Sequence, residues 1–486
     1  MIATDRPARD VPSGVAASGR WVARFGRPDR SGEAAAGAFG SPPATAWALD
    51  AGRPELRLTV DPDDAPPAWA ELQGCRLIFD GVLYNRAELT RHLADRATVR
   101  SNDAALVLGT YLRWGEAALS RIKGIFALVL WDGRNDTLLG ARDPLGVYPL
   151  YYAEAGAEHE VLLATSVNGL VRQPGVGRAL NRAALADHLC HRWPDVGETY
   201  YQQVRRIPPG HVLRVDRAGR RLRRYWDPAP LDAPVRWIRD EELGRFDELI
   251  EQAVERFLDL GRAGVFLSGG LDSVSIAAVA ADSARRHGRP APHALSLVFP
   301  DPESNEELTQ RAVAGNLGLP QTVVRFAEAV GPQGLFAAAL ELSASLPLPL
   351  LNFWLPGYCH LARIGQRQGC QVILTGGGGD EWLGVSPFYA ADLLRAGKLS
   401  GLRGLAASAR RSYRTPRLRV LQDVLWTFGA RLLLEAAIHR LLRRAAPGVL
   451  VARRRWHVAR LTPRWVAPDR ALRRELDERA LQSAPD

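Results

Sequence analysis

The six residues Ser268–Ser273 (Ser-Gly-Gly-Leu-Asp-Ser) carry the side chains best suited to hold a polyphosphate. Their two glycines allow the backbone to turn tightly and to approach an anion closely. Ser268 and Ser273 offer hydroxyl groups, and a helix that begins here offers unpaired N–H groups and the positive end of its dipole. The Asp272 carboxylate has the wrong charge to bind phosphate, so its expected role is to hold a Mg²⁺ ion that bridges the phosphates. The alternative is a glycine turn that only caps a helix.

A second glycine-rich segment, Thr375–Glu381 (Thr-Gly-Gly-Gly-Gly-Asp-Glu), follows the apolar run 371–374. In an open α/β sheet, ligands bind beyond the carboxyl ends of the strands, so we expect both glycine-rich segments to face one crevice. Taken by itself, Asp380 is explained as an acidic residue at the start of a helix.

The segments that must position these motifs alternate between short apolar runs and helical patterns. This alternation predicts an α/β doubly wound parallel sheet, followed from about residue 400 by a helical C-terminal part. The expected strands are 264–267, 294–298, 322–324 and 371–374, and the expected helices are 241–258, 274–284, 306–317 and 355–368.

The first part of the chain has a different pattern, which predicts an α+β layered domain. Short apolar runs at 77–79, 125–131 and 161–164 read as buried strands, and 103–114 reads as a helix. The Asp-Gly pairs that follow the first two runs predict tight turns. A proline-containing segment near residue 228 reads as a linker, so we predict two domains, residues 1–228 and 229–486.

Composition limits the classes of protein that this chain can be. Its 486 residues include 63 Lys+Arg and 53 Asp+Glu, for a net charge of +10, and only Lys123 and Lys398 are lysines. No apolar stretch is long enough for a transmembrane helix, and the first residues lack the apolar core of a secretory signal. The four cysteines form no CxxC pair, which fits a reducing cytoplasm. The positive charge leaves nucleic acid, an anionic membrane surface or an acidic substrate as candidate partners.

Ser268–Ser273 resembles the pyrophosphate loop of the ATP-pyrophosphatase superfamily, and Thr375–Glu381 is similar to the second nucleotide motif of the asparagine synthetase family. The resemblance implies that ATP is a substrate, that Asp272 and Asp380 bind Mg²⁺, and that Gly376 packs against the nucleotide. It also implies that two leucines flank the adenine. The nucleotide-binding set is then Leu267, Ser268, Gly269, Gly270, Leu271, Asp272, Ser273, Leu297 and Gly376.

Motifs of the first domain resemble, in chain order, the class II glutamine amidotransferase domain of asparagine synthetases. Together with the nucleotide motifs, they extend the resemblance over about residues 75–400. These motifs are Phe79–Asn85, Ser101–Asp103, Gly124–Ala127, Gly140–Tyr152, Arg205–His211 and Tyr225–Trp226.

The chain departs from the family pattern at several functional positions. Residue 2 is Ile2 where a working glutaminase of this class has cysteine, and the oxyanion Asn-Gly pair is Asp80-Gly81. Gly377 stands where asparagine synthetases have a glutamate and β-lactam-forming relatives a tyrosine, so the general acid/base is unassigned, with Glu381 or a tyrosine as candidates. No lysine follows Lys398, although relatives use a late lysine. Such losses resemble β-lactam synthetases and lasso-peptide macrolactam synthetases.

These features predict a ligase that activates a carboxylate as an acyl-adenylate, releases pyrophosphate and joins the acyl group to an amine without glutamine. Lasso-peptide macrolactam formation fits best, with a precursor peptide and a processing protease as partners, and a homodimer is left open. The alternatives are an asparagine synthetase that uses ammonia, a non-catalytic subunit, or a tRNA-modifying enzyme. The amidotransferase-like motifs argue against the last, so we do not expect a nucleic-acid partner.

Overall fold

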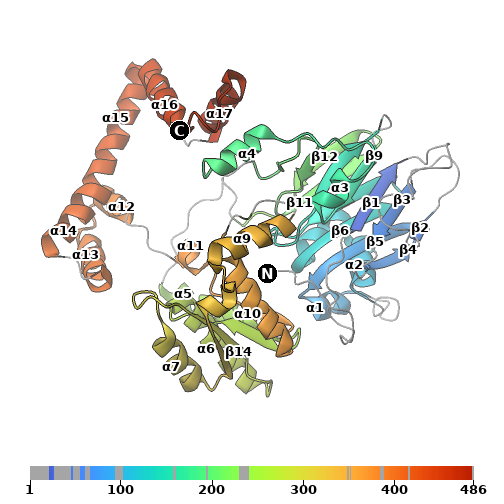
Figure 1. The fold of residues 1–486 in the computed structure, drawn as a ribbon, viewed down its shortest axis with the longest axis horizontal. Coiled ribbons are helices and arrows are strands. Elements are labelled where there is room, and N and C mark those ends of the chain that lie inside the picture. The colour runs from blue at the N-terminus through green and yellow to red at the C-terminus, as the bar shows by residue number, and fades with distance from the viewer. Residues whose placement is uncertain are drawn as a thin grey trace. The chain divides into compact units, whose positions relative to one another are not determined.

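The computed structural model describes residues 21–26, 45–47, 55–60, 66–93, 102–156, 160–192, 195–228, 240–346, 350, 352–383, 388–413 and 416–483. These residues fall into two compact units (Figure 1). The first lies within Met1–Ala184 and Pro194–Gly376, and the second within Leu185–Trp193 and Gly377–Asp486. The predicted boundary at residue 228 adjoins residues 229–239, which lie outside the described residues, so it stays a prediction.

The N-terminal part of the first unit contains two six-stranded sheets whose strand pairs are antiparallel. The order of one sheet is β10-β8-β9-β1-β3-β2, and that of the other is β12-β11-β7-β6-β5-β4. The strands are β1 Trp21–Gly26, β2 Thr45–Trp47, β3 Glu55–Val60, β4 Ala68–Leu72, β5 Cys75–Leu83, β6 Gly124–Asp132, β7 Thr137–Arg142, β8 Tyr151–Ala155, β9 Glu160–Ala164, β10 Val204–Arg206, β11 His211–Asp216 and β12 Gly219–Arg224.

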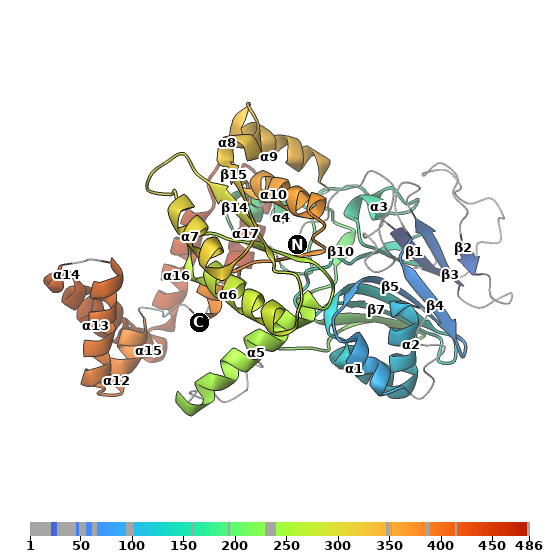
Figure 2. The same ribbon diagram turned by 90° about the horizontal axis from the view of Figure 1, so that it is seen from below.

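Alternating side chains along β5 explain why these sheets form layers. Leu77 and Phe79 point into a core shared with helix α2, while Ile78 points into the core between the two sheets, where it meets Trp21 of β1. Helix α2 packs on β4 and β5, so helices cover the outside of this sheet (Figure 2). The helices of this part are α1 Arg86–Arg91, α2 Asp103–Trp114, η2 Gly115–Arg121, α3 Val167–Val171 and α4 Arg182–Leu189. The predicted α+β layered domain is confirmed, and α2 has the predicted bounds.

One predicted turn is wrong. Asp80 and Gly81 lie within β5, where Gly81 pairs with Phe126 of β6, and the strand continues to Leu83. Gly81 has φ +143°, and a Cβ atom there would lie 2.1 Å from the carbonyl oxygen of Ile125. The glycine therefore serves a close approach between paired strands and not a chain reversal.

The second part of the first unit is a four-stranded sheet of order β15-β14-β13-β16, all of whose pairs are parallel. One core joins α5, α6 and α7 to one face, and another joins α8 and α10 to the opposite face, as expected for a doubly wound sheet. The predicted fold class is thus confirmed. The elements are α5 Asp240–Leu258, β13 Ala263–Phe266, α6 Leu271–Arg286, β14 His293–Val298, α7 Glu307–Leu317, β15 Gln321–Arg325, α8 Phe326–Val330, α9 Gly334–Ser345, α10 Leu355–Arg367 and β16 Val372–Leu374.

The second unit is helical. The end of α4 belongs to it, because Asp187 pairs with Arg479 at 3.7 Å and Arg192 donates to the Thr462 hydroxyl at 3.0 Å. Residues 377–486 contain 21 Lys+Arg and 10 Asp+Glu, so this segment carries the whole positive excess of the chain. The helices are α11 Gly379–Leu383, α12 Tyr389–Arg395, α13 Leu399–Tyr413, α14 Arg417–Leu421, η3 Gln422–Ala430, α15 Arg431–Ala445, α16 Pro447–Leu461 and α17 Arg470–Ser483.

Among the described residues, none of the helices combines the length and the apolar character needed to cross a membrane.

Candidate functional site

The Ser268–Ser273 segment connects the first strand of the parallel sheet to the helix that follows it. Strand β13 ends at Phe266, Gly270 is the N-cap of α6, and the Val274 N–H donates the first helical bond to the Gly270 carbonyl at 3.2 Å. Four residues, 267–270, therefore bridge strand and helix. The loop lies at the carboxyl end of β13, where the predicted crevice requires it.

Ser273 closes this loop from within. The residue is 6% exposed, and its hydroxyl lies 3.1 Å from the Ser268 carbonyl oxygen and 3.0 Å from that of Gly270. The Ser268 N–H donates to Ser273 Oγ at 3.1 Å, and the two Oγ atoms are 2.8 Å apart. Ser273 thus fixes the loop conformation from a buried position, and its hydroxyl is already engaged by the loop itself.

Sequence reasoning missed one residue of this loop environment, Glu306. The Gly269 N–H donates to Glu306 Oε2 at 2.8 Å. Glu306 precedes α7, which follows β14, the neighbour of β13 in the sheet. The available signal was topological, because loops after adjacent parallel strands meet at one edge of a sheet.

Gly376 brings the second motif to the first. The strand order changes direction between β13 and β16, and Gly376 follows β16 directly after Thr375. A Cβ atom on Gly376 would lie 2.6 Å from Ser273 N and 2.8 Å from the Asp272 carbonyl carbon. Only glycine fits this contact without a shift of backbone, so the two loops meet at the switch point where open α/β sheets bind ligands.

Asp272 lies in the first turn of α6 and is half-buried. Within the described residues, its side chain has no hydrogen-bond or ion-pair partner. A carboxylate oxygen is the ligand that Mg²⁺ prefers, and this one fits that use. No group of three or more His, Cys, Asp or Glu side chains gathers among the described residues, so a cation here would depend on phosphate oxygens for other ligands, which is usual for Mg²⁺.

The other predicted residues fall into three environments. Leu267 is buried in the core under α6, and its carbonyl accepts a 2.9 Å bond from Ser296 Oγ. Leu297 of β14 is partly buried in the core beneath α10, whereas Leu271 is 80% exposed. Asp380 is exposed in the first turn of α11 and belongs to the second compact unit. Its partnership with Asp272 therefore stays a prediction.

Comparison with known proteins follows the same two-part order. The glutamine amidotransferase domain family matches residues 51–226, and the asparagine synthase family matches residues 245–480. The chain belongs to the asparagine synthetase family.

Curated relatives agree with this family. Asparagine synthetase 3 (glutamine-hydrolysing) of Bacillus subtilis is 30% identical over 241 residues, which cover 48% of this chain and 38% of that protein. Asparagine synthetase 1 of the same organism is 25% identical, over 65% of this chain and 48% of that protein. Amidase chry2 of Gibberella zeae is 28% identical, over 69% of this chain and 51% of that protein. The chain thus matches about half or less of each relative's length.

The amidotransferase-like domain of this asparagine synthetase family member uses its motif residues internally. Asp80 is 5% exposed and accepts a 2.7 Å bond from Trp21 Nε1. Arg142 donates to the carbonyls of Tyr148 at 2.6 Å and Ile207 at 3.0 Å, and burial lowers its pKa. Asp143 is 1% exposed, and burial raises its pKa. Its carboxylate accepts from the N–H groups of three residues of the following turn, Leu145, Val147 and Tyr148.

The first cysteine of the chain is not a candidate glutaminase nucleophile. Cys75 is fully buried at the start of β5, and its thiol lies 3.3 Å from Asp132 Oδ1. Burial, followed by the hydrogen bond to Asp132, raises the pKa of Cys75 to about 12. A thiol with that pKa is almost entirely protonated at neutral pH and is a poor nucleophile. Residue 2 lies outside the described residues.

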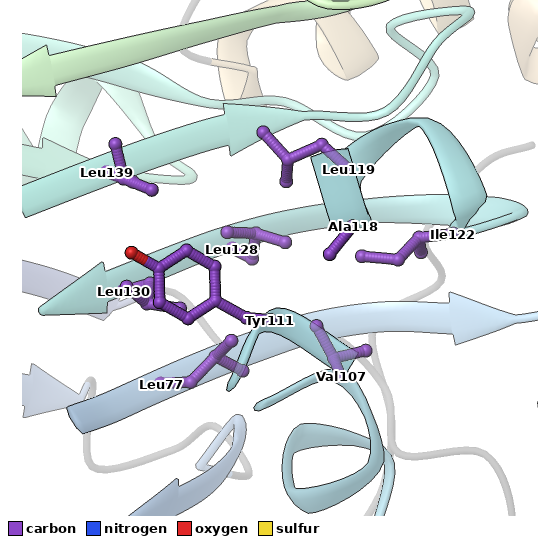
Figure 3. Close-up of a pocket in the computed structure, with 9 residues that line it drawn as sticks. All are labelled: Leu77, Val107, Tyr111, Ala118, Leu119, Ile122, Leu128, Leu130 and Leu139. Carbon is purple, nitrogen blue, oxygen red and sulfur yellow. The ribbon is translucent and has the colours of Figure 1, made fainter. Parts of the chain in front are cut away.

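A cavity in the same domain carries no chemistry. Figure 3 shows aliphatic side chains around the ring of Tyr111, whose hydroxyl donates to Asp132 at 3.0 Å. No other lining residue has a polar side chain, so we interpret the cavity as a packing gap between α2, η2 and the sheet. Its lining residues are Leu77, Val107, Tyr111, Ala118, Leu119, Ile122, Leu128, Leu130 and Leu139.

Proposed function

We propose that this chain is an ATP-dependent ligase that forms an amide bond. A carboxylate oxygen of the substrate attacks the α-phosphorus of ATP, the bond to the bridging oxygen breaks, and pyrophosphate leaves. An amine nitrogen then attacks the acyl carbon of the adenylate, loses a proton, and AMP leaves. Two easier steps replace one difficult step.

The observation that carries this proposal is the contact of Gly376 with the start of α6. It joins two glycine-rich loops at the switch point of a parallel sheet, next to a helix N-terminus. That arrangement supports a site for pyrophosphate, because backbone N–H groups and the helix dipole favour anions there. Membership of the asparagine synthetase family supports the choice of adenylation over other phosphate chemistry.

In this proposal, Ser268 and the loop N–H groups hold the leaving pyrophosphate, and Asp272 and Asp380 hold Mg²⁺. When bound, Mg²⁺ neutralises charge on the phosphates. The second motif has no side chain at Gly377 for proton transfer, so the general acid/base stays unassigned.

We further propose that the amine does not come from glutamine. Asp80 occupies the position of the family's oxyanion asparagine, and it is buried against the Trp21 indole. A carboxylate there opposes the negative charge that develops in glutamine hydrolysis. The amine is then part of the substrate or free ammonia.

A peptide substrate fits the distribution of charge better than a single amino acid does. Residues 377–486 carry a net charge of +11, from 21 Lys+Arg less 10 Asp+Glu, which attracts an acidic segment. Joining a side-chain carboxylate of such a peptide to its own amino group is macrolactam formation, as in lasso peptides. This proposal requires a precursor peptide and a processing protease as partners. Asparagine formation from aspartate and ammonia is the competing outcome.

ATP–pyrophosphate exchange tests the proposal before the amine is identified, because the adenylation step does not require it. Labelled pyrophosphate should enter ATP in the presence of a peptide with an acidic side chain, more strongly than with aspartate. Asp272→Ala should abolish exchange, whereas Asp282→Ala should not, because Asp282 lies on the same helix and pairs with Arg286. Exchange that needs aspartate alone would select asparagine formation.

Glutamine independence has a separate test. The full chain, incubated with glutamine, ATP and the active carboxylate, should release glutamate no faster than buffer does. Glutamate release that depends on the protein would contradict this part of the proposal and leave the ligase intact.

A further inference from the structure

Glu306 places a carboxylate where the pyrophosphate loop should receive a phosphate oxygen. Its Oε2 atom accepts the Gly269 N–H at 2.8 Å. Gly269 is one of the two glycines that let this backbone approach an anion, and its N–H is among the few donors that the loop offers. The N–H cannot make a full hydrogen bond to Glu306 and to a phosphate at the same time.

Packing supports the hydrogen bond. A Cβ atom on Gly269 would lie 2.9 Å from Glu306 Cβ and 3.0 Å from Glu306 Cδ. The glutamate stem therefore lies against the loop, and glycine at residue 269 makes room for it. The contact joins the loop after β13 to the loop after β14.

Among the described residues, no cationic side chain pairs with Glu306, whereas the adjacent Glu307 pairs with Arg311 at 2.7 Å. Glu306 is exposed, so it can leave the loop without breaking a core contact. A negative charge this near the loop repels a polyphosphate anion unless a cation lies between them.

We propose that Glu306 is a competing carboxylate that occupies the loop when no nucleotide is bound and makes the site select metal-complexed over metal-free polyphosphate. Metal-free pyrophosphate must displace the Glu306 carboxylate and is also repelled by its negative charge. Pyrophosphate that carries Mg²⁺ meets less repulsion, because the cation offsets both negative groups. This inference rests on the proposed function of the loop.

Calorimetric titration of the full chain with inorganic pyrophosphate tests the inference, once with Mg²⁺ and once with a chelator. Glu306→Gln keeps the size of the side chain and removes its charge. We expect this variant to bind metal-free pyrophosphate about tenfold more tightly than the original chain does. Binding with Mg²⁺ should change less, so the preference for the metal complex should fall.

Glu307→Gln is the matched control, since it removes the same charge one residue away from the loop contact. It should leave both affinities within about twofold of the original. Glu306→Asp, one methylene shorter, should keep the repulsion but lose the bond to Gly269, and should fall between the original and Glu306→Gln.

Equal or weaker binding of metal-free pyrophosphate by Glu306→Gln would overturn the inference. A selective loss of binding with Mg²⁺ would also overturn it, because Glu306 would then be a metal ligand. If the original chain and every variant fail to bind pyrophosphate with or without Mg²⁺, the proposed function fails instead.

Discussion

The aspartates of the family motifs have different hydrogen-bonding environments in the two motif-bearing regions of the first unit. In the amidotransferase-like domain, Asp80 and Asp143 are buried and bonded to groups of the same domain. In the first turn of α6, directly after the loop that follows β13, Asp272 is half-buried without a partner among the described residues. Both regions resemble family motifs, but their aspartates differ: Asp80 and Asp143 are bonded within their domain, whereas Asp272 has no partner among the described residues. A motif whose polar atoms are satisfied internally maintains a fold, and a motif whose atoms remain open supports a site.

The largest contrast should appear when an aspartate is removed from each region. Asp143→Ala leaves three backbone N–H groups of the following turn without their acceptor, so the free energy of unfolding should fall by about 3 kcal/mol. Asp272→Ala should change it by less than about 0.5 kcal/mol. Urea denaturation of both variants measures the difference. Similar losses in the two variants would remove the distinction between the regions.

Gly376→Ala tests the same contrast in the nucleotide-binding region. The new Cβ atom would meet Ser273 N at 2.6 Å, and the backbone of one loop would have to move. We expect pyrophosphate binding to weaken about 100-fold, corresponding to about 2.7 kcal/mol, with a smaller loss of stability. Gly315→Ala on α7, where nothing lies within 4 Å of the added atom, is the control. Unchanged binding in Gly376→Ala would show that the contact is irrelevant to the loop.

A smaller effect concerns pH and the buried carboxylate of Asp132 in the amidotransferase-like domain. The Arg134 guanidinium, bonded at 2.8 and 2.9 Å, holds the pKa of Asp132 well below its usual value. This carboxylate therefore adds stability that is complete above about pH 4 and is lost as the pH falls toward its native pKa. Asp132→Asn should flatten the acid side of the stability profile by up to about 1.4 kcal/mol per pH unit. Parallel acid profiles for the two proteins would contradict this assignment.

Ser268→Ala and Ser273→Ala should separate two functions within one loop. Ser273 Oγ closes the turn on the Ser268 and Gly270 carbonyls, so its loss should cost about 1 kcal/mol of stability. Ser268→Ala should cost less stability but weaken pyrophosphate binding. Thermal unfolding and calorimetry of both variants compare the effects. Equal stability losses would show that neither hydroxyl has a distinct role.

The spacing of apolar residues predicted most of the fold, because this spacing follows from which side chains are buried. The apolar spacing of 103–114 predicted α2, and alternating strands and helices after residue 240 predicted the parallel sheet. The prediction of a turn at Asp80-Gly81 was wrong because an Asp-Gly pair occurs in both contexts. The glycine can allow a chain reversal or, as here, a close contact between paired strands. Glu306 was missed because its contact with Gly269 joins residues 37 positions apart, and only the sheet order brings them together.

Site prediction was limited in the same way. The sequence identified Ser273 as a hydroxyl for the ligand, but the position of that hydroxyl inside the turn depends on three-dimensional contacts with Ser268 and Gly270. Gly376 was assigned to the nucleotide, and the structure adds its contact with the first turn of α6. The sequence gives the chemical type of each residue, but the groups that its side chain contacts depend on the three-dimensional structure.

In the proposed function, the loop after β13 binds pyrophosphate through a metal held by Asp272. Calorimetric titration of the full chain with magnesium pyrophosphate tests it most directly, since no carboxylate or amine substrate is needed. The original chain and Asp282→Ala should bind with similar affinity, and Asp272→Ala should lose at least about tenfold of it. Absence of binding by the original chain, or equal binding by Asp272→Ala, would contradict the claim.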